Sequence, residues 1–140
     1  MFVLDASVIV KWFSEEQYTA EALDIRGKFL AGECNIAVPD LLLYELANSL
    51  RYNPSFNEAD VEQAITSLFD MGIDIIAPVS GLITEATKLA FRHDITIYDA
   101  FYIALATDLG YALVTSDMKL HQKVKQLDFV KFLSGFNGIY

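Results

Sequence analysis

The sequence predicts an α/β fold in which helices cover both faces of a mainly parallel sheet. Short, continuously apolar segments alternate with longer segments in which apolar residues recur at helical spacing. Continuous rather than alternating apolar strands are typical of a sheet that is buried on both faces. Their alternation with helices favours parallel pairing through helical crossovers. We therefore predict a three-layer α/β/α sandwich with a mainly parallel central sheet.

The predicted elements follow one another along the whole chain. The strands are short and apolar, and they cover residues 2–4, 36–38, 74–77, 112–115 and 129–132. Helical patterns cover residues 7–13, 16–30, 41–52, 58–71, 81–92, 99–109 and 119–126. Gly32, Gly72 and Gly110 follow helical patterns, where a left-handed C-cap is expected. Pro39 and Pro78 end strands and turn the chain toward the next helix.

Length and composition predict one domain that associates with itself. A chain of 140 residues fits a single core, and no repeat, low-complexity tract or linker divides it, so we expect one domain over residues 1–140. The hydrophobic fraction of 54% is high, and several helical patterns are apolar on more than one face. We expect a homodimer, because so short a chain has little interior in which to bury this much apolar surface.

The location is expected to be cytoplasmic, without membrane contact. The longest uncharged stretches, such as residues 75–84, are shorter than the ~20 residues of a membrane span. The N-terminus has no basic region ahead of a long apolar segment. Cys34 is the single cysteine, so it has no partner for an internal disulfide and no second sulfur for a zinc site.

The net charge of −9 argues against a protein that holds nucleic acid by a general basic surface. A nucleic-acid substrate is still compatible with this charge, because bound cations would cancel part of it. Five basic residues remain available to flank a cleft, and they are Lys11, Arg51, Arg92, Lys119 and Lys123. We expect substrate binding to be weak and sensitive to salt.

Four acidic residues stand in otherwise apolar surroundings. Asp5 follows the strand 2–4 and Asp117 follows the strand 112–115, so both lie at carboxyl ends, where parallel sheets bind ligands. Glu45 and Asp99 interrupt stretches that are otherwise almost wholly apolar. Two carboxylates ~5 Å apart repel each other by roughly 3 kcal/mol at an effective dielectric of ~20. A cluster of four needs protons or a divalent cation, and hard oxygen ligands favour Mg²⁺ or Mn²⁺.

Capping is the simpler explanation of the two acidic residues that follow strands. Asp5 and Asp117 can each cap the helix that comes next. Ser7 can cap the first helix equally well, which leaves the carboxylate of Asp5 available as a ligand. In isolation Asp117 is explained by capping alone, and only the company of the other three acidic residues makes it a site candidate.

The two acidic residues on helices also have structural explanations. Glu45 lies one turn before Asn48 and can belong to a solvent-facing stripe. Asp99 lies in the first turn of its helix and gains from the helix dipole. Asp40 and Thr96 can cap these two helices without help from either acidic residue.

Four segments together resemble the PIN-domain nucleases, and more closely the VapC-type toxins of toxin–antitoxin pairs. They are residues 3–7 (VLDAS), 44–50 (YELANSL), 98–106 (YDAFYIALA) and 113–117 (LVTSD). The resemblance spans nearly the whole chain and implies a Mg²⁺- or Mn²⁺-dependent endoribonuclease, usually a homodimer, that a small cognate antitoxin holds inactive. In such an enzyme a cation-activated water attacks the RNA phosphodiester bond and leaves a 5′-phosphate.

The resemblance also assigns roles to residues. The family's catalytic and metal-binding acidic positions fall on Asp5, Glu45, Asp99 and Asp117. Its hydroxyl positions fall on Ser7 and Thr115, which would orient Asp5 and the cluster, and Asn48 matches a polar position that accompanies the helix glutamate. The alternative within the same fold is a catalytically silent interaction module.

Other enzyme classes fit the residues less well. His93 and His121 lie near helix ends in polar surroundings, and the chain has no glycine-rich phosphate loop and no nucleophile elbow. A haloacid-dehalogenase-type phosphatase needs a second aspartate two residues after the first, where this chain has Ser7. A response-regulator receiver needs an acidic pair near the first strand, and Asp5 has no acidic neighbour.

Overall fold

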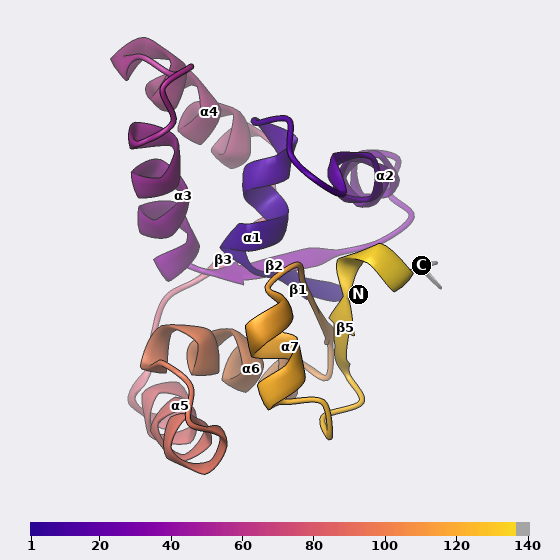
Figure 1. Ribbon diagram of the computed structural model, residues 1–140, viewed down its shortest axis with the longest axis vertical. Helices are drawn as coiled ribbons and strands as arrows, with labels where there is room; N and C mark the ends of the chain where they lie inside the picture. The colour runs from indigo at the N-terminus through magenta and orange to yellow at the C-terminus, as the bar shows by residue number, and fades with distance from the viewer. Residues whose placement is uncertain (137–140) are drawn as a thin grey trace.

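The computed structural model describes residues 1–136, which form a five-stranded sheet between two layers of helices (Figure 1). The strands are β1 (Phe2–Leu4), β2 (Ile36–Pro39), β3 (Asp74–Ile76), β4 (Ala112–Thr115) and β5 (Val130–Phe132). The helices are α1 (Ala6–Ile9), α2 (Thr19–Leu30), α3 (Leu41–Arg51), α4 (Glu58–Asp70), α5 (Ser80–His93), α6 (Ile97–Leu109) and α7 (Met118–Lys123), with 3-10 turns η1 (Val10–Trp12) and η2 (Leu133–Gly135). The predicted α/β/α architecture is confirmed, and all four strand pairings are parallel.

The helices cover both faces of the sheet. Figure 1 shows α1, α2, α3 and α4 on one side of the strands and α5, α6 and α7 on the other. Helix α6 contacts β1, β2 and β4, and its residues 100–106 are all buried, as its nearly all-round apolar pattern predicts. Within residues 1–136, no helix is both long enough and apolar enough to cross a membrane.

The strand order β3-β2-β1-β4-β5 creates a switch point at the centre of the sheet. From β1 the chain moves outward through β2 to β3, and it then returns to the other side of β1 for β4 and β5. Ligands of parallel sheets bind beyond the carboxyl ends of the strands at such a reversal. Leu4 is paired with Val114, so Asp5 and the residues that follow β4 lie at this switch point.

Element boundaries differ from the predicted ones where local turns intervene. The predicted helix 7–13 is the short α1 continued by η1, and α2 begins at Thr19 rather than Glu16. The Thr19 hydroxyl donates to the Glu16 carbonyl at 2.9 Å and accepts from the Glu16 amide at 2.8 Å, which closes a turn ahead of the helix. Gly32, Gly72 and Gly110 have φ angles of 76°, 78° and 69°, which confirms the predicted left-handed conformation.

Replacing Thr96 by alanine is expected to lower the free energy of unfolding by about 1 kcal/mol. The Thr96 hydroxyl accepts the Asp99 amide at 3.0 Å, and alanine would leave this first-turn donor of α6 without a cap. Thr84→Ala is the control, because the exposed Thr84 hydroxyl donates back to the Ser80 carbonyl within α5 and caps nothing. Urea unfolding measures the free energy of unfolding of both variants and of the parent. Equal losses of this free energy in Thr96→Ala and Thr84→Ala would contradict the capping role of Thr96.

Candidate active site

Asp5 leaves the sheet at the end of β1 and is buried, with 5% of its surface exposed. It stands at the N-cap position of α1, yet its carboxylate makes no capping hydrogen bond. The Ser7 hydroxyl instead donates to Oδ1 of Asp5 at 2.5 Å. Capping therefore does not explain why a carboxylate is buried here.

Ser7 connects the chain after β1 to the chain after β4. Its Oγ accepts the Ser116 amide at 2.8 Å and lies 3.4 Å from the Thr115 hydroxyl. The Ser116 hydroxyl lies 3.3 Å from the Ser7 carbonyl, to which it donates, and the Asp117 amide donates to Thr115 Oγ1 at 3.0 Å. This network orients Asp5 through the predicted hydroxyl residues. Ser116 is not among the predicted residues, although its position between Thr115 and Asp117 is a signal that points to it.

Glu45 on α3 is half-buried and accepts a hydrogen bond from a helix on the other side of the sheet. The Tyr102 hydroxyl on α6 donates to Glu45 Oε1 at 2.6 Å, and Tyr102 is 1% exposed. Glu45 is therefore not part of a solvent-facing stripe, although Asn48 one turn later is exposed. Tyr102 is also missing from the predicted set, and its spacing of three residues from Asp99 on one helix face is the signal that was available. Asp40 occupies the N-cap position of α3, as predicted, although its side chain makes no capping bond.

Asp99 and Asp117 complete the acidic group from the other side of the sheet. Asp99 is half-buried in the first turn of α6, where Thr96 does the capping, as predicted. Asp117 is exposed, and its Oδ1 accepts the Leu120 amide at 3.1 Å. The capping explanation of Asp117 is thus observed, and it uses only one of the two carboxylate oxygens.

The electrostatics of Asp5 reflect its burial. Loss of hydration raises the pKa of Asp5 to about 6, hydrogen bonds from Ser7 and Thr115 oppose the rise, and the charge of Asp99 adds to it. A carboxyl group poised near neutral pH is uncommon in a core and is a recognised mark of functional sites.

The other carboxylates also repel one another. Burial raises the pKa of Glu45, the Tyr102 hydrogen bond opposes this, and the charge of Asp99 adds to it. Burial and the charge of Asp117 raise the pKa of Asp99. Burial also raises the pKa of Tyr102, followed by the charges of Glu45, Asp5 and Asp99. The charges of three of the four predicted acidic residues therefore act on one tyrosine hydroxyl, which is hydrogen-bonded to Glu45, and the charge of Asp117 acts on Asp99.

Two hollows contain three of the four acidic residues, and the buried Asp5 lines neither. One has a volume of about 550 Å³, and Ser7, Glu45 and Asn48 are part of its wall. The other has a volume of about 420 Å³ and is lined in part by Asp99 and Asp117. No three acidic, histidine or cysteine side chains within residues 1–136 converge closely enough to hold a metal ion by themselves. The predicted four-carboxylate cluster is thus an open group rather than a closed cage.

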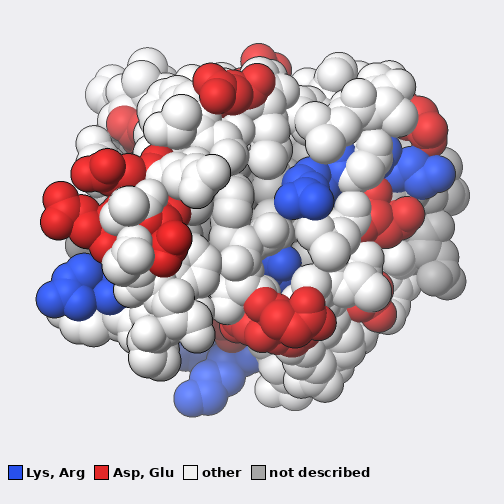
Figure 2. Space-filling model, turned by 90° about the horizontal axis from the view of Figure 1, so that it is seen from above, with Lys and Arg blue, Asp and Glu red and all other residues white. Residues whose placement is uncertain are grey.

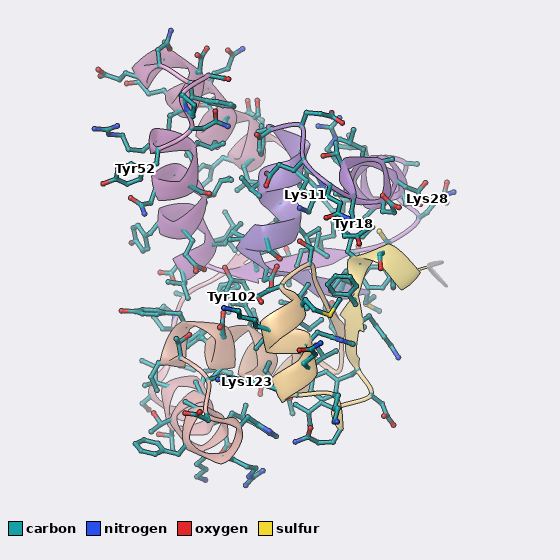
Figure 3. All side chains as sticks on the ribbon, viewed as in Figure 1. Lys11, Tyr18, Lys28, Tyr52, Tyr102 and Lys123 are labelled. Atoms are coloured by element: carbon teal, nitrogen blue, oxygen red, sulfur yellow. The ribbon has the colours of Figure 1, made fainter. Side chains whose placement is uncertain are left out.

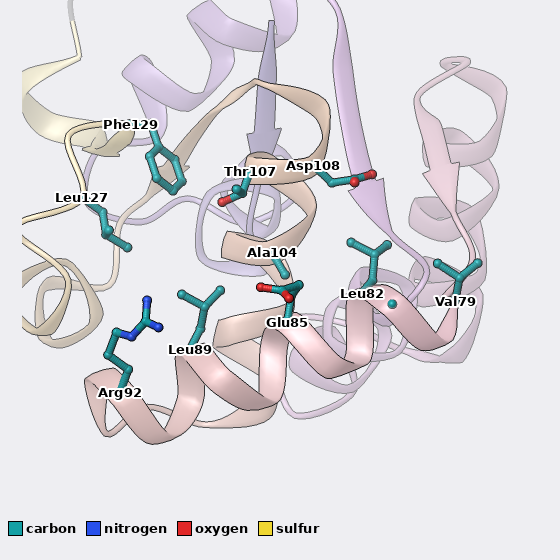
Figure 4. A pocket seen from close by; sticks show the side chains of 11 residues that line it. Val79, Leu82, Glu85, Leu89, Arg92, Ala104, Thr107, Asp108, Leu127 and Phe129 are labelled. Atoms are coloured by element: carbon teal, nitrogen blue, oxygen red, sulfur yellow. The ribbon is translucent and has the colours of Figure 1, made fainter.

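A further hollow of about 830 Å³ lies between α5, α6 and residues 127–129. Figure 4 shows apolar side chains of α5 on its wall together with Glu85, Arg92 and Asp108. None of the four acidic residues at the sheet edge lines it. The switch point therefore remains the candidate active site.

Comparisons with known proteins agree with this fold. The PIN domain family model matches residues 2–126. Ribonuclease VapC1 of Mycobacterium tuberculosis is 36% identical over 120 residues, which cover 84% of this chain and 86% of that protein. Ribonuclease VapC3 of Pyrobaculum aerophilum is 27% identical over 129 residues, which cover 89% of this chain and 95% of that protein. The chain belongs to the PIN-domain family.

A solved structure supports the same fold assignment. A chain of a toxin–antitoxin complex from Klebsiella pneumoniae superimposes on this one with a TM-score of 0.72. The match covers 95% of this chain and 98% of that chain, although only 16% of the residues are identical. At this level of identity the likeness concerns the fold alone.

The raised pKa of Asp5 predicts that the metal-free protein loses stability as the pH rises from about 4 to 6. In this window folded Asp5 keeps its proton, whereas the unfolded chain, with a pKa of 3.8, has released it. The unfolded state then binds fewer protons, so a rise in pH favours unfolding, by at most about 3 kcal/mol in total.

Urea unfolding in EDTA between pH 4 and 7 measures this dependence. Asp5→Asn removes the ionisation, so its free energy of unfolding should fall less with pH, and at pH 7 it should exceed that of the parent. Identical pH profiles for the two proteins would mean that Asp5 is not the group responsible.

Proposed function

We propose that the protein is a VapC-type ribonuclease, the toxin of a toxin–antitoxin pair, and that the acidic edge of its sheet cleaves RNA phosphodiester bonds. The observation that carries this proposal is the buried Asp5 and the Tyr102-bonded Glu45 at the switch point of the sheet, where the charge of Asp99 acts on both carboxylates. Two relatives that match most of this chain are ribonucleases. The acidic group, the fold and these relatives all support hydrolysis of RNA rather than a silent interaction module.

Mg²⁺ or Mn²⁺ is part of the proposal. The candidate ligands are the carboxylates of Asp5, Glu45, Asp99 and Asp117, and these ions prefer such hard oxygen donors. Mg²⁺ keeps several waters and uses only one or two protein carboxylates. An open group suits such an ion, even though no three acidic side chains of residues 1–136 form a cage.

The chain's own residues orient the acidic group and hold the substrate. Ser7 orients Asp5, and the amide of Ser116 keeps the Ser7 hydroxyl in position. Tyr102 donates to Glu45 and favours its ionised form. Asn48 lines the same hollow as Glu45, and its amide would donate to the RNA backbone. When bound, the ion would activate water and stabilise charge on the phosphate.

The surface charge fits a weakly held substrate. Figure 2 shows acidic atoms gathered in several groups over one face, with smaller basic groups among them and no continuous basic stripe. Together with the net charge of −9, this surface gives RNA little long-range attraction. Binding would depend on the ion at the site and on local contacts, and it would weaken as the salt concentration rises.

The proposal includes two protein partners, a second copy of the chain and a cognate antitoxin. Large apolar side chains are exposed on α3 and directly after it, on α5 and at the start of α6, and these are Tyr44, Tyr52, Ile83, Phe91, Ile97 and Tyr98. Such surface is available for both partners. The Klebsiella pneumoniae structure is a toxin–antitoxin complex, which supports the second. The cytoplasm is the proposed location, and residues 1–140 are the proposed single domain.

The purified protein, freed of antitoxin, should cleave single-stranded RNA in the presence of Mg²⁺ or Mn²⁺ and not in EDTA. Asp5→Asn should lower the rate about 100-fold or more, because loss of a metal ligand removes several kcal/mol of charge stabilisation. Glu62→Gln is the matched control, since Glu62 is an exposed carboxylate on α4. The assay uses several end-labelled RNAs, and the products should carry 5′-phosphates. No metal-dependent cleavage of any RNA, with Asp5→Asn equal to the parent, would favour the silent module.

Mn²⁺ should raise the melting temperature of the protein. An ion that binds only the folded state adds about 2.7 kcal/mol to the free energy of unfolding when its concentration is 100 times its dissociation constant. Asp99→Asn should melt at or above the parent in EDTA, because it relieves repulsion with Asp117, and it should respond less to Mn²⁺. Differential scanning calorimetry with and without Mn²⁺ measures both quantities. A large loss of stability of Asp99→Asn in EDTA would instead assign Asp99 a structural role.

A further inference from the structure

Lys11 is a buried lysine beside the acidic edge. It belongs to η1 and is 7% exposed, whereas lysine is almost never buried unless it is paired. The ion pairs within residues 1–136 involve Lys28, Lys88 and Lys123, and no hydrogen bond or ion pair there reaches the ammonium group of Lys11. Three N–H donors on a single cation are therefore without a protein partner in the described part of the chain.

The ammonium group of Lys11 is nevertheless open to solvent. Among the described residues, Nε2 of His93 is the one side-chain nitrogen or oxygen that is inaccessible to solvent and has no hydrogen-bond partner. Nζ of Lys11 also lacks a partner but is not among these inaccessible atoms, so water or a ligand can reach it. Figure 3 shows Lys11 between α1 and α2, on the side of the sheet that also carries α3.

The space that Lys11 reaches is the hollow of about 550 Å³ at the active site. Its wall also contains Ser7, Glu45 and Asn48. The same hollow therefore holds a cation, an exposed amide, one member of the acidic group and a second, exposed carboxylate, that of Glu16. Packing of the aliphatic stem explains why most of Lys11 is buried. It does not explain why the charge ends in this hollow without a carboxylate within pairing distance.

We propose that Lys11 binds a non-bridging oxygen of an RNA phosphate next to the scissile one, an assignment that rests on the proposed ribonuclease function. A lysine ammonium binds phosphate as a point charge. Lys119 and Lys123 are part of the second hollow, which also contains Asp99 and Asp117. A single strand would run from Lys11 past the carboxylates toward this second hollow. Lys11 is then a substrate-binding residue that offsets the acidic surface where the backbone enters the site.

Kinetics of three variants test the assignment. Lys11→Met keeps the apolar stem and removes the charge, Lys11→Arg keeps the charge, and Lys88→Met removes an exposed charge on α5 that pairs with Glu85. Lys11→Met should raise KM for single-stranded RNA about 10-fold, with kcat within about threefold of the parent. Lys11→Arg should retain most of the affinity, and Lys88→Met should match the parent.

Salt dependence separates a phosphate contact from a packing role. With Asp5→Asn as the background, binding of labelled RNA is measured by fluorescence anisotropy at several salt concentrations. Loss of one phosphate contact should make the slope of log K against log salt shallower by about 0.7 for Lys11→Met. An unchanged slope and an unchanged KM would overturn the assignment. If the parent neither cleaves nor binds RNA, the ribonuclease proposal itself fails.

Chemical footprinting of the parent protein needs no substitution, and it decides the case if Lys11→Met does not fold. The protein is acetylated with and without single-stranded RNA, and each lysine is quantified by mass spectrometry. RNA should slow acetylation of Lys11 at least about threefold and leave Lys88 unchanged. Equal acetylation of Lys11 with and without RNA, under conditions where RNA binds, would contradict the proposal.

Discussion

The parallel register of β1 with β4 determines which side chains leave the sheet together. Because Leu4 is paired with Val114, the next residues of the two strands, Asp5 and Thr115, emerge at the same edge. Side chains alternate between the faces of a strand, so a slip of one residue would send one of them to the opposite face. Ser7 reinforces this register beyond the sheet, where it meets Thr115 and accepts the Ser116 amide. The geometry of the acidic edge depends on this pairing.

The acidic edge is electrostatically unfavourable, and the surrounding core holds it in place. Burial and the charge of Asp99 disfavour ionised Asp5, and two hydroxyl groups recover only part of the lost hydration. Glu45 and Asp99 are in the same position, with Tyr102 and Thr96 as their respective donors. Groups that destabilise a fold in this way are retained at functional sites, where a ligand supplies the missing compensation. Lys11 is the corresponding case for a positive charge, because no carboxylate within residues 1–136 forms an ion pair with it.

The sequence predicts best what depends on local pattern. The strand boundaries at 2–4 and 112–115 match the structure, because a short apolar run between polar residues has few alternative conformations. Three glycine C-caps are also correct, since only a positive φ accounts for glycine at that point. Contacts between distant segments were harder to predict. The bond from Tyr102 to Glu45 joins the two helical layers, so the spacing of Tyr102 from Asp99 could suggest the residue but not its partner. The burial of Lys11 depends on its tertiary neighbours, for which its own segment contains no signal. A four-carboxylate cluster was predicted from residue type, but residue type cannot specify how closely the oxygens converge.

The central position of β1 has a consequence for the synthesis of the chain. Ser7 and Thr115 are separated by 108 positions, so the pairing that creates the acidic edge waits for the last strands. A nascent chain that ends before residue 112 has the segments of β1, β2 and β3 but lacks both β4 and Asp117. Distant pairings of this kind form late, after the entropy of closing a long loop has been overcome. The acidic edge is therefore complete only when almost the whole chain has been translated.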